Sequence, residues 1–344
     1  MLKGNVIMNI KDTVITLSQS YGASGNEESA AETALDMVRK YCEEAEIKNG
    51  NVTARFGKFQ EGRPSLLLDA HIDQVGLIVT HITDEGFIKF SALGGIDRRL
   101  LPAQQVVIHG KKDIKGVICS VPPHLSGNSG SVPEIGDFSI DSGMSAETLS
   151  DIVSPGDSIT FDVKCRELLG GRVSGCAFDD RSGVASILYA LELLKDKKLK
   201  YNVTVLFSVQ EELGERGAKI GAYEINPDLA IAVDVSFGYA SGETEHKCGY
   251  LGKGPMIGIS PSLSRELSEG LIKTAEDKNI PYQIEVMNGL TSTNADRFSV
   301  NREGAKACTV SIPLRYMHTP VEVIEISDVE LTGKLLAEFI KEDE

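Results

Sequence analysis

The sequence predicts an α/β fold that a small inserted β domain interrupts, and three observations support this fold class. Short apolar runs typical of buried strands alternate with amphipathic segments in residues 1–74 and again in residues 166–344. Residues 75–165 instead carry short strand-like runs separated by Gly, Pro and Asp turns. A chain of 344 residues is long enough for one large α/β domain with a smaller domain attached. We therefore expect residues 1–74 and 166–344 to form one domain that residues 75–165 interrupt.

The first α/β segment is expected to hold a helix followed by a buried strand. After the turn-forming residues 22–25, apolar residues recur at helical spacing between Asn26 and Glu44, which predicts an amphipathic helix. Residues 65–70 (SLLLDA) are typical of a buried strand of a parallel sheet, and His71 follows at the C-terminal end. Open α/β sheets bind their ligands at this end of the strands, so His71 is a candidate functional residue.

The insert is expected to be all-β. Its short apolar runs predict strands at residues 76–82, 106–108, 116–120 and 158–163. The connection over residues 122–141 is rich in Gly, Ser and Pro, a composition typical of a long mobile loop.

Helical and strand patterns alternate again in the second α/β segment. We predict helices at residues 180–194, 266–275 and 329–340, and strands at residues 203–209, 229–235, 256–259 and 307–312. The alternation resumes the pattern of the first segment, so both segments are expected to contribute to one sheet.

Composition excludes several classes of protein. Hydrophobic residues make up 41% of the chain and charged residues 25%, as in ordinary globular proteins, and no apolar run approaches the roughly 20 residues that span a bilayer. Residues 1–10 lack the apolar stretch of a secretory signal, so we expect a cytoplasmic protein. The six scattered cysteines are expected to be reduced thiols. A net charge of -15 argues against nucleic acid and anionic membranes as partners and favours small or peptidic substrates.

Five segments carry metal-binding side chains at the end of a predicted strand or the start of a helix. Any one of them is more often a capping or turn residue, whereas five together point to a site. Two histidines and three carboxylates suit zinc, cobalt or manganese, and one carboxylate must bridge if two ions are bound. The candidate ligands come from residues 70–73 (AHID), 178–181 (FDDR), 210–212 (QEE), 233–234 (VD) and 317–320 (MHTP).

Two further acidic residues have expected roles beside these ligands. Asp73 lies two residues after His71 on the same side of an extended segment, where its carboxylate could accept the other ring N–H of His71. Glu211 and Glu212 follow a buried strand, and a turn at that point would aim one carboxylate at a metal and the other at a water. The pair then supplies one ligand and one general base, although an isolated acidic pair is more often a solvated helix start.

The ordered set of these segments resembles the TET-type aminopeptidases, a family of dinuclear metallopeptidases that includes glutamyl and deblocking aminopeptidases. The resemblance covers nearly the whole chain, and the ordered set is specific where single elements are not. It is carried by residues 70–76 (AHIDQVG), 116–125 (GVICSVPPHL), 176–183 (CAFDDRSG), 208–217 (SVQEELGERG), 231–235 (IAVDV), 251–255 (LGKGP) and 312–323 (IPLRYMHTPVEV).

The resemblance implies a mixed sheet flanked by helices, of the zinc-peptidase type, as the catalytic metallopeptidase domain. Residues 75–165 would then be a small β-barrel or PDZ-like domain used for dimerisation, and dimers would assemble into a dodecamer. The implied activity is removal of N-terminal residues from short peptides through a metal-bridging water.

Each site residue takes an implied role from the resemblance. His71 and Asp234 would hold one divalent ion, Glu212 and His318 the other, and Asp179 would bridge them. The list of catalytic residues is completed by Glu211, as the base that activates the water, and by Asp73. Zinc or cobalt is the expected metal, with manganese as a further option. Asp180, next to the bridging residue, is expected to be structural.

The chain departs from the family pattern at two places. Gln74 stands where the family commonly has Glu, so the site holds one negative charge fewer, which is expected to affect metal preference. Residues 291–296 differ from the usual Gly-Thr-Asp pattern at the rim of the site and are expected to reshape a substrate pocket. The preferred N-terminal residue stays open, since Arg297 or Arg315 would be the available partners for an acidic side chain.

Two alternatives remain at this level. A non-catalytic assembly or metal-binding homologue would keep the same fold and the same ligands. An endoglucanase-type glycosidase would use two of the carboxylates, but it explains neither His71 nor His318, and a chain without Trp and with 6% aromatic residues offers few platforms for sugar rings. We therefore favour a dinuclear metallo-aminopeptidase.

Overall fold

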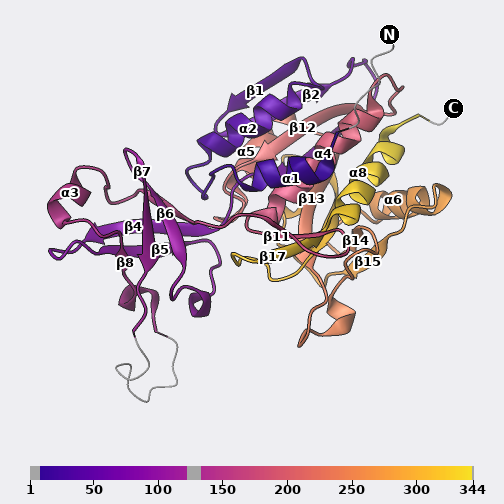
Figure 1. Cartoon of the computed structure of the whole chain (residues 1–344). Coiled ribbons are helices and arrows are strands. Elements are labelled where there is room, and N and C mark those ends of the chain that lie inside the picture. Colours follow the sequence, from indigo (N-terminus) through magenta and orange to yellow (C-terminus); the bar gives the residue numbers. More distant parts are fainter. Residues whose placement is uncertain (1–7, 122–132, 343–344) are drawn as a thin grey trace, which may run out of the picture.

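The protein consists of a large α/β unit from which a small β-barrel projects, as shown in Figure 1 by a computed structural model. The structure describes residues 8–121 and 133–342. The expected fold class, a mixed sheet flanked by helices with an inserted small β-barrel, is confirmed. Part of the Gly-, Ser- and Pro-rich loop, residues 122–132, lies outside the described residues.

The central sheet of the α/β unit is mixed. Strands β3, β12, β13 and β16 are parallel neighbours at its centre, whereas β2 and β14 flank them in the antiparallel sense. In sheet order the strands are β1 (Glu44–Lys48), β2 (Asn51–Phe56), β12 (Asn202–Ser208), β3 (Ser65–His71), β13 (Leu229–Phe237), β16 (Lys306–Leu314), β14 (Met256–Ile259) and β15 (Gln283–Val286).

Helices cover both faces of this sheet, and the alternation of side chains along β3 shows why. Leu66 and Leu68 lie in one apolar cluster and Leu67 in another, so successive residues face opposite helical layers. The first cluster is closed by α1 (Ile10–Ser18), α2 (Glu28–Val38), α4 (Phe178–Leu194), α6 (Arg265–Asp277) and α8 (Ile326–Ile340). The second is closed by α5 (Arg216–Ile225) and the short α7 (Ala295–Phe298).

The barrel has an apolar core of its own, separate from the two clusters of the main sheet. It closes in the order β4 (Gly76–Ile82), β5 (Ile88–Leu93), β8 (Ile140–Asp141), β7 (Asp113–Ile118), β6 (Gln105–His109) and β9 (Ser158–Phe161). Its short helices are η1 (Arg98–Leu100), η2 (Ile135–Asp137) and α3 (Ala146–Ser150). A separate small sheet joins β10 (Arg166–Glu167), β11 (Arg172–Gly175) and β17 (Glu322–Glu325), and η3 (Glu245–Lys247) lies in a loop of the α/β unit.

The predicted helix over residues 26–44 is wrong at its C-terminal end. Helix α2 ends at Val38, and the chain turns into β1, whose first residue is Glu44. Strand β1 is an edge strand whose side chains are largely exposed. Its polar residues do not interrupt the helical pattern of the preceding segment, so the sequence gives no sign that the helix ends. The predicted strand over residues 116–120 begins earlier, at Asp113, and ends at Ile118.

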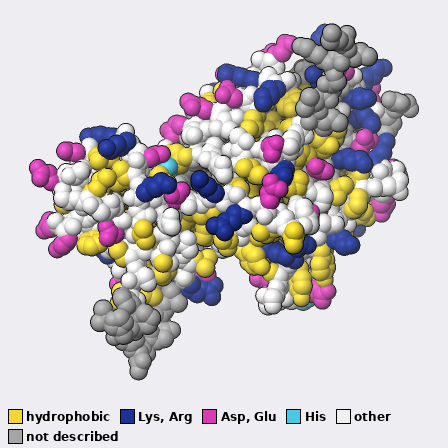
Figure 2. Space-filling model, viewed as in Figure 1, with side chains coloured by type: hydrophobic (Ala, Val, Ile, Leu, Met, Phe, Trp, Pro, Cys, Tyr) yellow, Lys and Arg dark blue, Asp and Glu magenta, His cyan; other side chains and the backbone are white. Residues whose placement is uncertain are grey.

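Surface and sulfur chemistry agree with the composition. Figure 2 shows acidic and basic side chains interspersed over the drawn face of both units. The six cysteines form no disulfide. Within residues 8–121 and 133–342, no helix has the length and apolarity needed to cross a membrane.

Candidate metal centre

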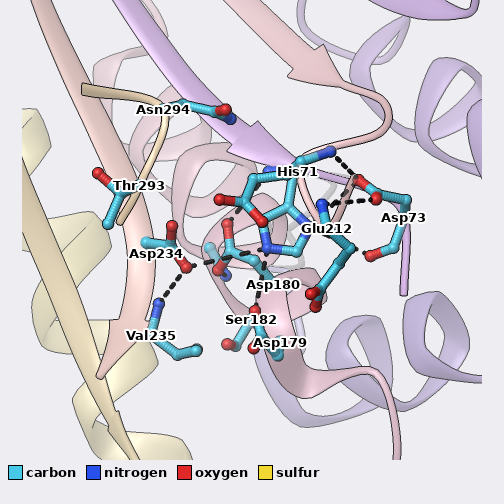
Figure 3. Close-up of polar contacts among 12 residues, drawn as sticks. His71, Asp73, Asp179, Asp180, Ser182, Glu212, Asp234, Val235, Thr293 and Asn294 are labelled. Atoms are coloured by element: carbon cyan, nitrogen blue, oxygen red, sulfur yellow. Dashed lines mark hydrogen bonds and ion pairs between the residues drawn. The ribbon is translucent and has the colours of Figure 1, made fainter. Parts of the chain in front are cut away.

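The candidate ligands meet at the C-terminal edge of the central strands, where the parallel topology brings them together. Figure 3 shows four of them, His71, Asp179, Glu212 and Asp234. His71 is the last residue of β3, and Asp234 lies near the end of β13. Asp179 lies at the kinked start of α4, Glu212 follows β12, and His318 comes from the loop between β16 and β17. The five ligands that the sequence predicts therefore converge on one site.

Backbone conformation aims three of these segments. Ala177, Gln210 and His318 have φ angles of 58°, 55° and 60°, in the left-handed region that non-glycine residues rarely adopt. Such residues cluster at functional sites, where the surrounding structure holds them in place. At Gln210 the left-handed turn comes directly before Glu211 and Glu212, where the sequence predicts that the strand must turn.

Asp179 lies between the two histidines. Its Oδ1 is 3.0 Å from Nε2 of His71, and its Oδ2 is 3.2 Å from Nε2 of His318. Each oxygen of one carboxylate thus faces a different imidazole, the arrangement required of a bridging ligand.

The outer carboxylates complete two groups around Asp179. Glu212 Oε1 is 3.1 Å from Nε2 of His318, and Asp234 Oδ1 is 3.9 Å from Nε2 of His71. Ligand atoms of His71, Asp179 and Glu212 lie within 4.8 Å of one another. These five side chains form what we call the cage: His71, Asp179, Glu212, Asp234 and His318.

Asp180 also approaches the cage, since it groups with His71 and Asp234 as a possible ligand set. Its oxygens, however, are engaged by backbone donors: Oδ2 accepts the N–H of His71 at 3.2 Å, and Oδ1 accepts the N–H of Gly183 at 3.0 Å. Asp179 accepts no hydrogen bond from either of these two backbone N–H groups. We therefore give more weight to Asp179 as the bridge and to Asp180 as a buried support.

Asp73 holds the turn that presents the acidic pair. Its carboxylate accepts the N–H of Glu211 at 2.9 Å and that of Glu212 at 3.1 Å. The ring Nδ1 of His71 lies 3.1 Å from the backbone oxygen of Asp73 and 3.4 Å from its carboxylate. The carbonyl oxygen is thus the nearer acceptor for the imidazole, and the carboxylate mainly fixes the backbone of Glu211 and Glu212.

The electrostatics of the cage are dominated by buried like charges. Burial, with the negative charge of Asp234 and Glu212, raises the pKa of Glu211 to about 9 despite the opposing effect of His71. Burial alone would lower the pKa of His318, but its hydrogen bonds to Asp179 and Glu212 raise it to about 11. Without a metal, the protein thus retains protons in the cage, a state that divalent cations would reverse.

Two supports of the cage escaped the sequence prediction. Glu322, fully buried, accepts the N–H of Phe178 at 2.8 Å and the N–H of His318 at 3.1 Å, so it ties two ligand-bearing segments together. The carbonyl oxygen of Gly95, in the loop after β5 of the insert, lies 2.9 Å from Nδ1 of His318. Glu322 lies inside a segment that carries the family resemblance, whereas nothing in the sequence signals a backbone carbonyl.

The other residues that the sequence singled out have defined places. Gln74 is buried, and its backbone N–H donates to the carbonyl of Gly22. Arg297 forms an ion pair with Glu215 at 2.9 Å, and Arg315 donates a hydrogen bond to the carbonyl of Tyr239 at 2.6 Å. Both guanidinium groups therefore already have a partner within the protein.

A cavity of about 970 Å³ opens beside the cage. Glu211, Glu212 and Asp234 form one side of it, and residues 284–293 contribute to another. The rim segment 291–293 does line this cavity, through Thr291, Ser292 and Thr293. The effect of these residues on substrate choice stays a prediction.

Comparisons with known proteins agree with this site. Residues 50–335 match the family model described as M42 glutamyl aminopeptidase. The chain is 30% identical to a lysyl aminopeptidase of Pyrococcus furiosus over 94% of each chain. Its structure is similar to aminopeptidase APDkam598 of Desulfurococcus kamchatkensis, with a TM-score of 0.90, 34% identity and 97% and 95% of the two chains covered. It is also similar to the TET1 peptidase of Pyrococcus horikoshii, which can assemble into a tetrahedron or a large octahedral shell, with a TM-score of 0.85, 34% identity and 97% and 100% covered.

Proposed function

Because the chain belongs to the M42 glutamyl aminopeptidase family and is a metal-dependent aminopeptidase, we propose that the cage holds two divalent ions and that Glu211 is the general base. His71 and Asp234 would hold one ion, Glu212 and His318 would hold the other, and Asp179 would contact both. The observation that carries this proposal is the position of the Asp179 carboxylate, with one oxygen facing each histidine.

The residues of the cage fit two divalent cations on two grounds. Zinc and cobalt bind both imidazole nitrogen and carboxylate oxygen. Manganese also binds such sites, and it prefers oxygen ligands. In addition, negative charge is in excess, since Asp179, Glu212 and Asp234 share one buried site with two imidazoles. Two divalent ions, with four positive charges, would offset the three negative charges of these carboxylates. We propose zinc or cobalt as the metal.

Bound ions would polarise the scissile carbonyl and acidify the attacking water. The ionised carboxylate of Glu211 accepts a proton from that water while the water oxygen forms a bond to the carbonyl carbon. As the carbon–nitrogen bond breaks, Glu211 returns the proton to the departing amine. The N–H groups of Glu211 and Glu212 donate hydrogen bonds to the Asp73 carboxylate, which holds the backbone of this acidic pair in place.

The proposal also covers the assembly of the protein and the size of its substrates. The TET1 peptidase of Pyrococcus horikoshii can assemble into a tetrahedron or a large octahedral shell, and a solved structure of PhTET1 is a dodecamer. We propose that this chain also assembles, through dimers built on its barrel, into a particle of twelve copies. A shell of that kind would admit short peptides. Light scattering on the purified protein tests the assembly independently of activity.

The two alternatives predict different outcomes in a simple assay. A glycosidase needs two carboxylates and leaves the histidines of the cage without a role. A metal-binding homologue would hold two ions without hydrolysis. Metal-loaded protein is expected to hydrolyse aminoacyl p-nitroanilides and to spare their N-acetylated forms and β-glucans; two bound ions without any hydrolysis would favour the homologue that only binds metal.

The role of Glu211 is tested by Glu211→Gln, with Glu269→Gln on the exposed face of α6 as the matched control. We expect Glu211→Gln to keep two ions per chain by elemental analysis and to lose roughly 1,000-fold or more in kcat, because the amide cannot accept the proton. Substantial residual turnover, or loss of the metals, would reject Glu211 as the base.

A further inference from the structure

Glu285 is a carboxylate that lines the cavity but does not belong to the cage. Glu285 belongs to β15, at the far edge of the sheet, and lines the cavity together with residues of β13 and β16. Ser311 Oγ donates to Glu285 Oε2 at 2.9 Å, and the hydroxyl of Ser236 donates to Oε1. The two serine hydroxyls fix the direction of the carboxylate without neutralising it.

The same two serines tie Glu285 to the cage. Ser236 follows Asp234 by two residues on β13, so both side chains leave the same face of the strand. Ser311 on β16 is the register partner of Asp234. Glu285 is therefore linked to the strand positions around Asp234, a ligand of the cage, through these two serines.

Glu285 has no positive partner among residues 8–121 and 133–342. None of the described Lys, Arg or His side chains forms an ion pair with it, and burial raises its pKa, with only the two serine hydroxyls acting in the opposite direction. Its neighbours in the cavity differ: Glu215 pairs with Arg297, and Asp296 accepts the backbone N–H groups of Thr291 and Ser292. A partly buried carboxylate without a counter-charge is costly, and its remaining lone pairs can accept donors from a ligand.

The cavity around Glu285 combines this charge with apolar walls. Met256, which pairs with Ser311 across the sheet, is buried, and Met287 follows β15. Methionine adapts its shape to the ligand it contacts. His246 and Lys247 also line the cavity, from the loop that contains η3, but neither pairs with Glu285. Apolar walls that lead to a carboxylate suit a long aliphatic side chain that ends in a cation.

We propose that Glu285 determines specificity by binding the side-chain cation of an N-terminal lysine or arginine. This inference rests on the proposed function, since it places the first residue of a peptide in the same cavity. A substrate with an acidic first residue would bring two carboxylates together and be rejected. An aliphatic first residue would leave the Glu285 carboxylate without a cationic partner.

The test compares lysyl and norleucyl p-nitroanilides, because norleucine keeps the four-carbon side chain and lacks the ammonium group. For the metal-loaded wild type, we expect kcat/KM to be roughly 10- to 100-fold higher for the lysyl substrate. In Glu285→Gln this ratio is expected to fall to about one, with norleucyl turnover retained. Glu269→Gln, an exposed glutamate on α6, should keep the wild-type ratio. Titration calorimetry with free L-lysine and L-norleucine should show the same change in preference without turnover.

The outcomes separate this inference from the proposed function. If the wild type hydrolyses none of the substrates, the proposed function fails. If it hydrolyses norleucyl and lysyl substrates equally, or if Glu285→Gln keeps the lysyl preference, the role of Glu285 is rejected while the aminopeptidase stands. An equal loss on both substrates would assign Glu285 to the α-amino group and also overturn the proposal.

Discussion

The two carboxylate-bearing walls of the cavity handle charge in opposite ways. In the cage, each acidic ligand faces an imidazole or another carboxylate, and Asp179 faces both histidines. Elsewhere on the cavity lining, Glu285 accepts hydrogen bonds from two serine hydroxyls. In our proposal, the first wall binds ions taken up from solution, and the second leaves one negative charge for the substrate. Reactivity and selectivity would then depend on different residues, which can be changed separately.

The largest expected effect comes from Asp179→Asn, compared with Asp180→Asn. The amide introduced by Asp179→Asn cannot bridge two cations, so we expect loss of at least one ion per chain and roughly 1,000-fold or more in kcat/KM. Asp180→Asn should keep both ions and lower the melting temperature, because it disturbs buried bonds to His71 and Gly183. Elemental analysis and thermal melts of both variants decide the matter; metal loss confined to Asp180→Asn would exchange the two roles.

Removal of the metals is expected to lower the free energy of unfolding by about 3–4 kcal/mol, relative to protein in free metal ion at roughly 1,000 times its Kd. In metal-free protein, burial raises the pKa of Glu211 to about 9, above its ordinary value of 4.5. The folded state then binds more protons than the unfolded state between these values, so stability from this group is present at low pH and is lost as pH rises through 9. Chelated protein should therefore lose stability from pH 6 to 9 in denaturant titrations. A flat profile would contradict a cage crowded with negative charge.

A smaller effect is expected from Glu322→Gln, with the exposed Glu330→Gln on α8 as control. An amide nitrogen would oppose one of the backbone N–H groups that Glu322 now accepts from Phe178 and His318. We expect metal affinity to fall by roughly 10- to 100-fold, measured by competition with a chelator. Unchanged affinity would mean that the ligand segments hold their places without this carboxylate.

The smallest expected effect concerns the second wall. Ser311→Ala removes one of the two hydroxyls that orient Glu285. The loss of one hydrogen bond of about 1 kcal/mol should reduce the lysyl-to-norleucyl ratio by about fivefold and leave metal content unchanged. Steady-state kinetics on the two substrates measure the ratio. A loss of metal in this variant would show that the two walls are not independent.

The sequence predicts most of the cage because its ligands follow buried strands. His71 and Asp234 end or nearly end long apolar runs, and parallel strands bring such ends to one edge of a sheet. The alternation of Leu66, Leu67 and Leu68 between two apolar clusters explains why these successive residues of β3 are all apolar. Local pattern and topology thus coincide at the centre of the fold.

Other features depend on contacts between residues distant in sequence. Gly95 reaches His318 through a carbonyl that every residue possesses, so its identity carries little information. Glu285 lies on an edge strand of four residues with alternating polar side chains, which resembles any exposed strand. The C-terminal end of α2 was misplaced for the same reason, since edge strand β1 is polar. Edges of sheets are set by tertiary pairing more than by local pattern.

The most direct test of the dinuclear cage is anomalous diffraction from crystals of the zinc-loaded protein, recorded on both sides of the zinc absorption edge. We predict two anomalous peaks per chain, one within bonding distance of His71 and Asp234 and the other of Glu212 and His318, with Asp179 contacting both. A single peak, or two peaks bridged by Asp180 in place of Asp179, would contradict the five-ligand cage.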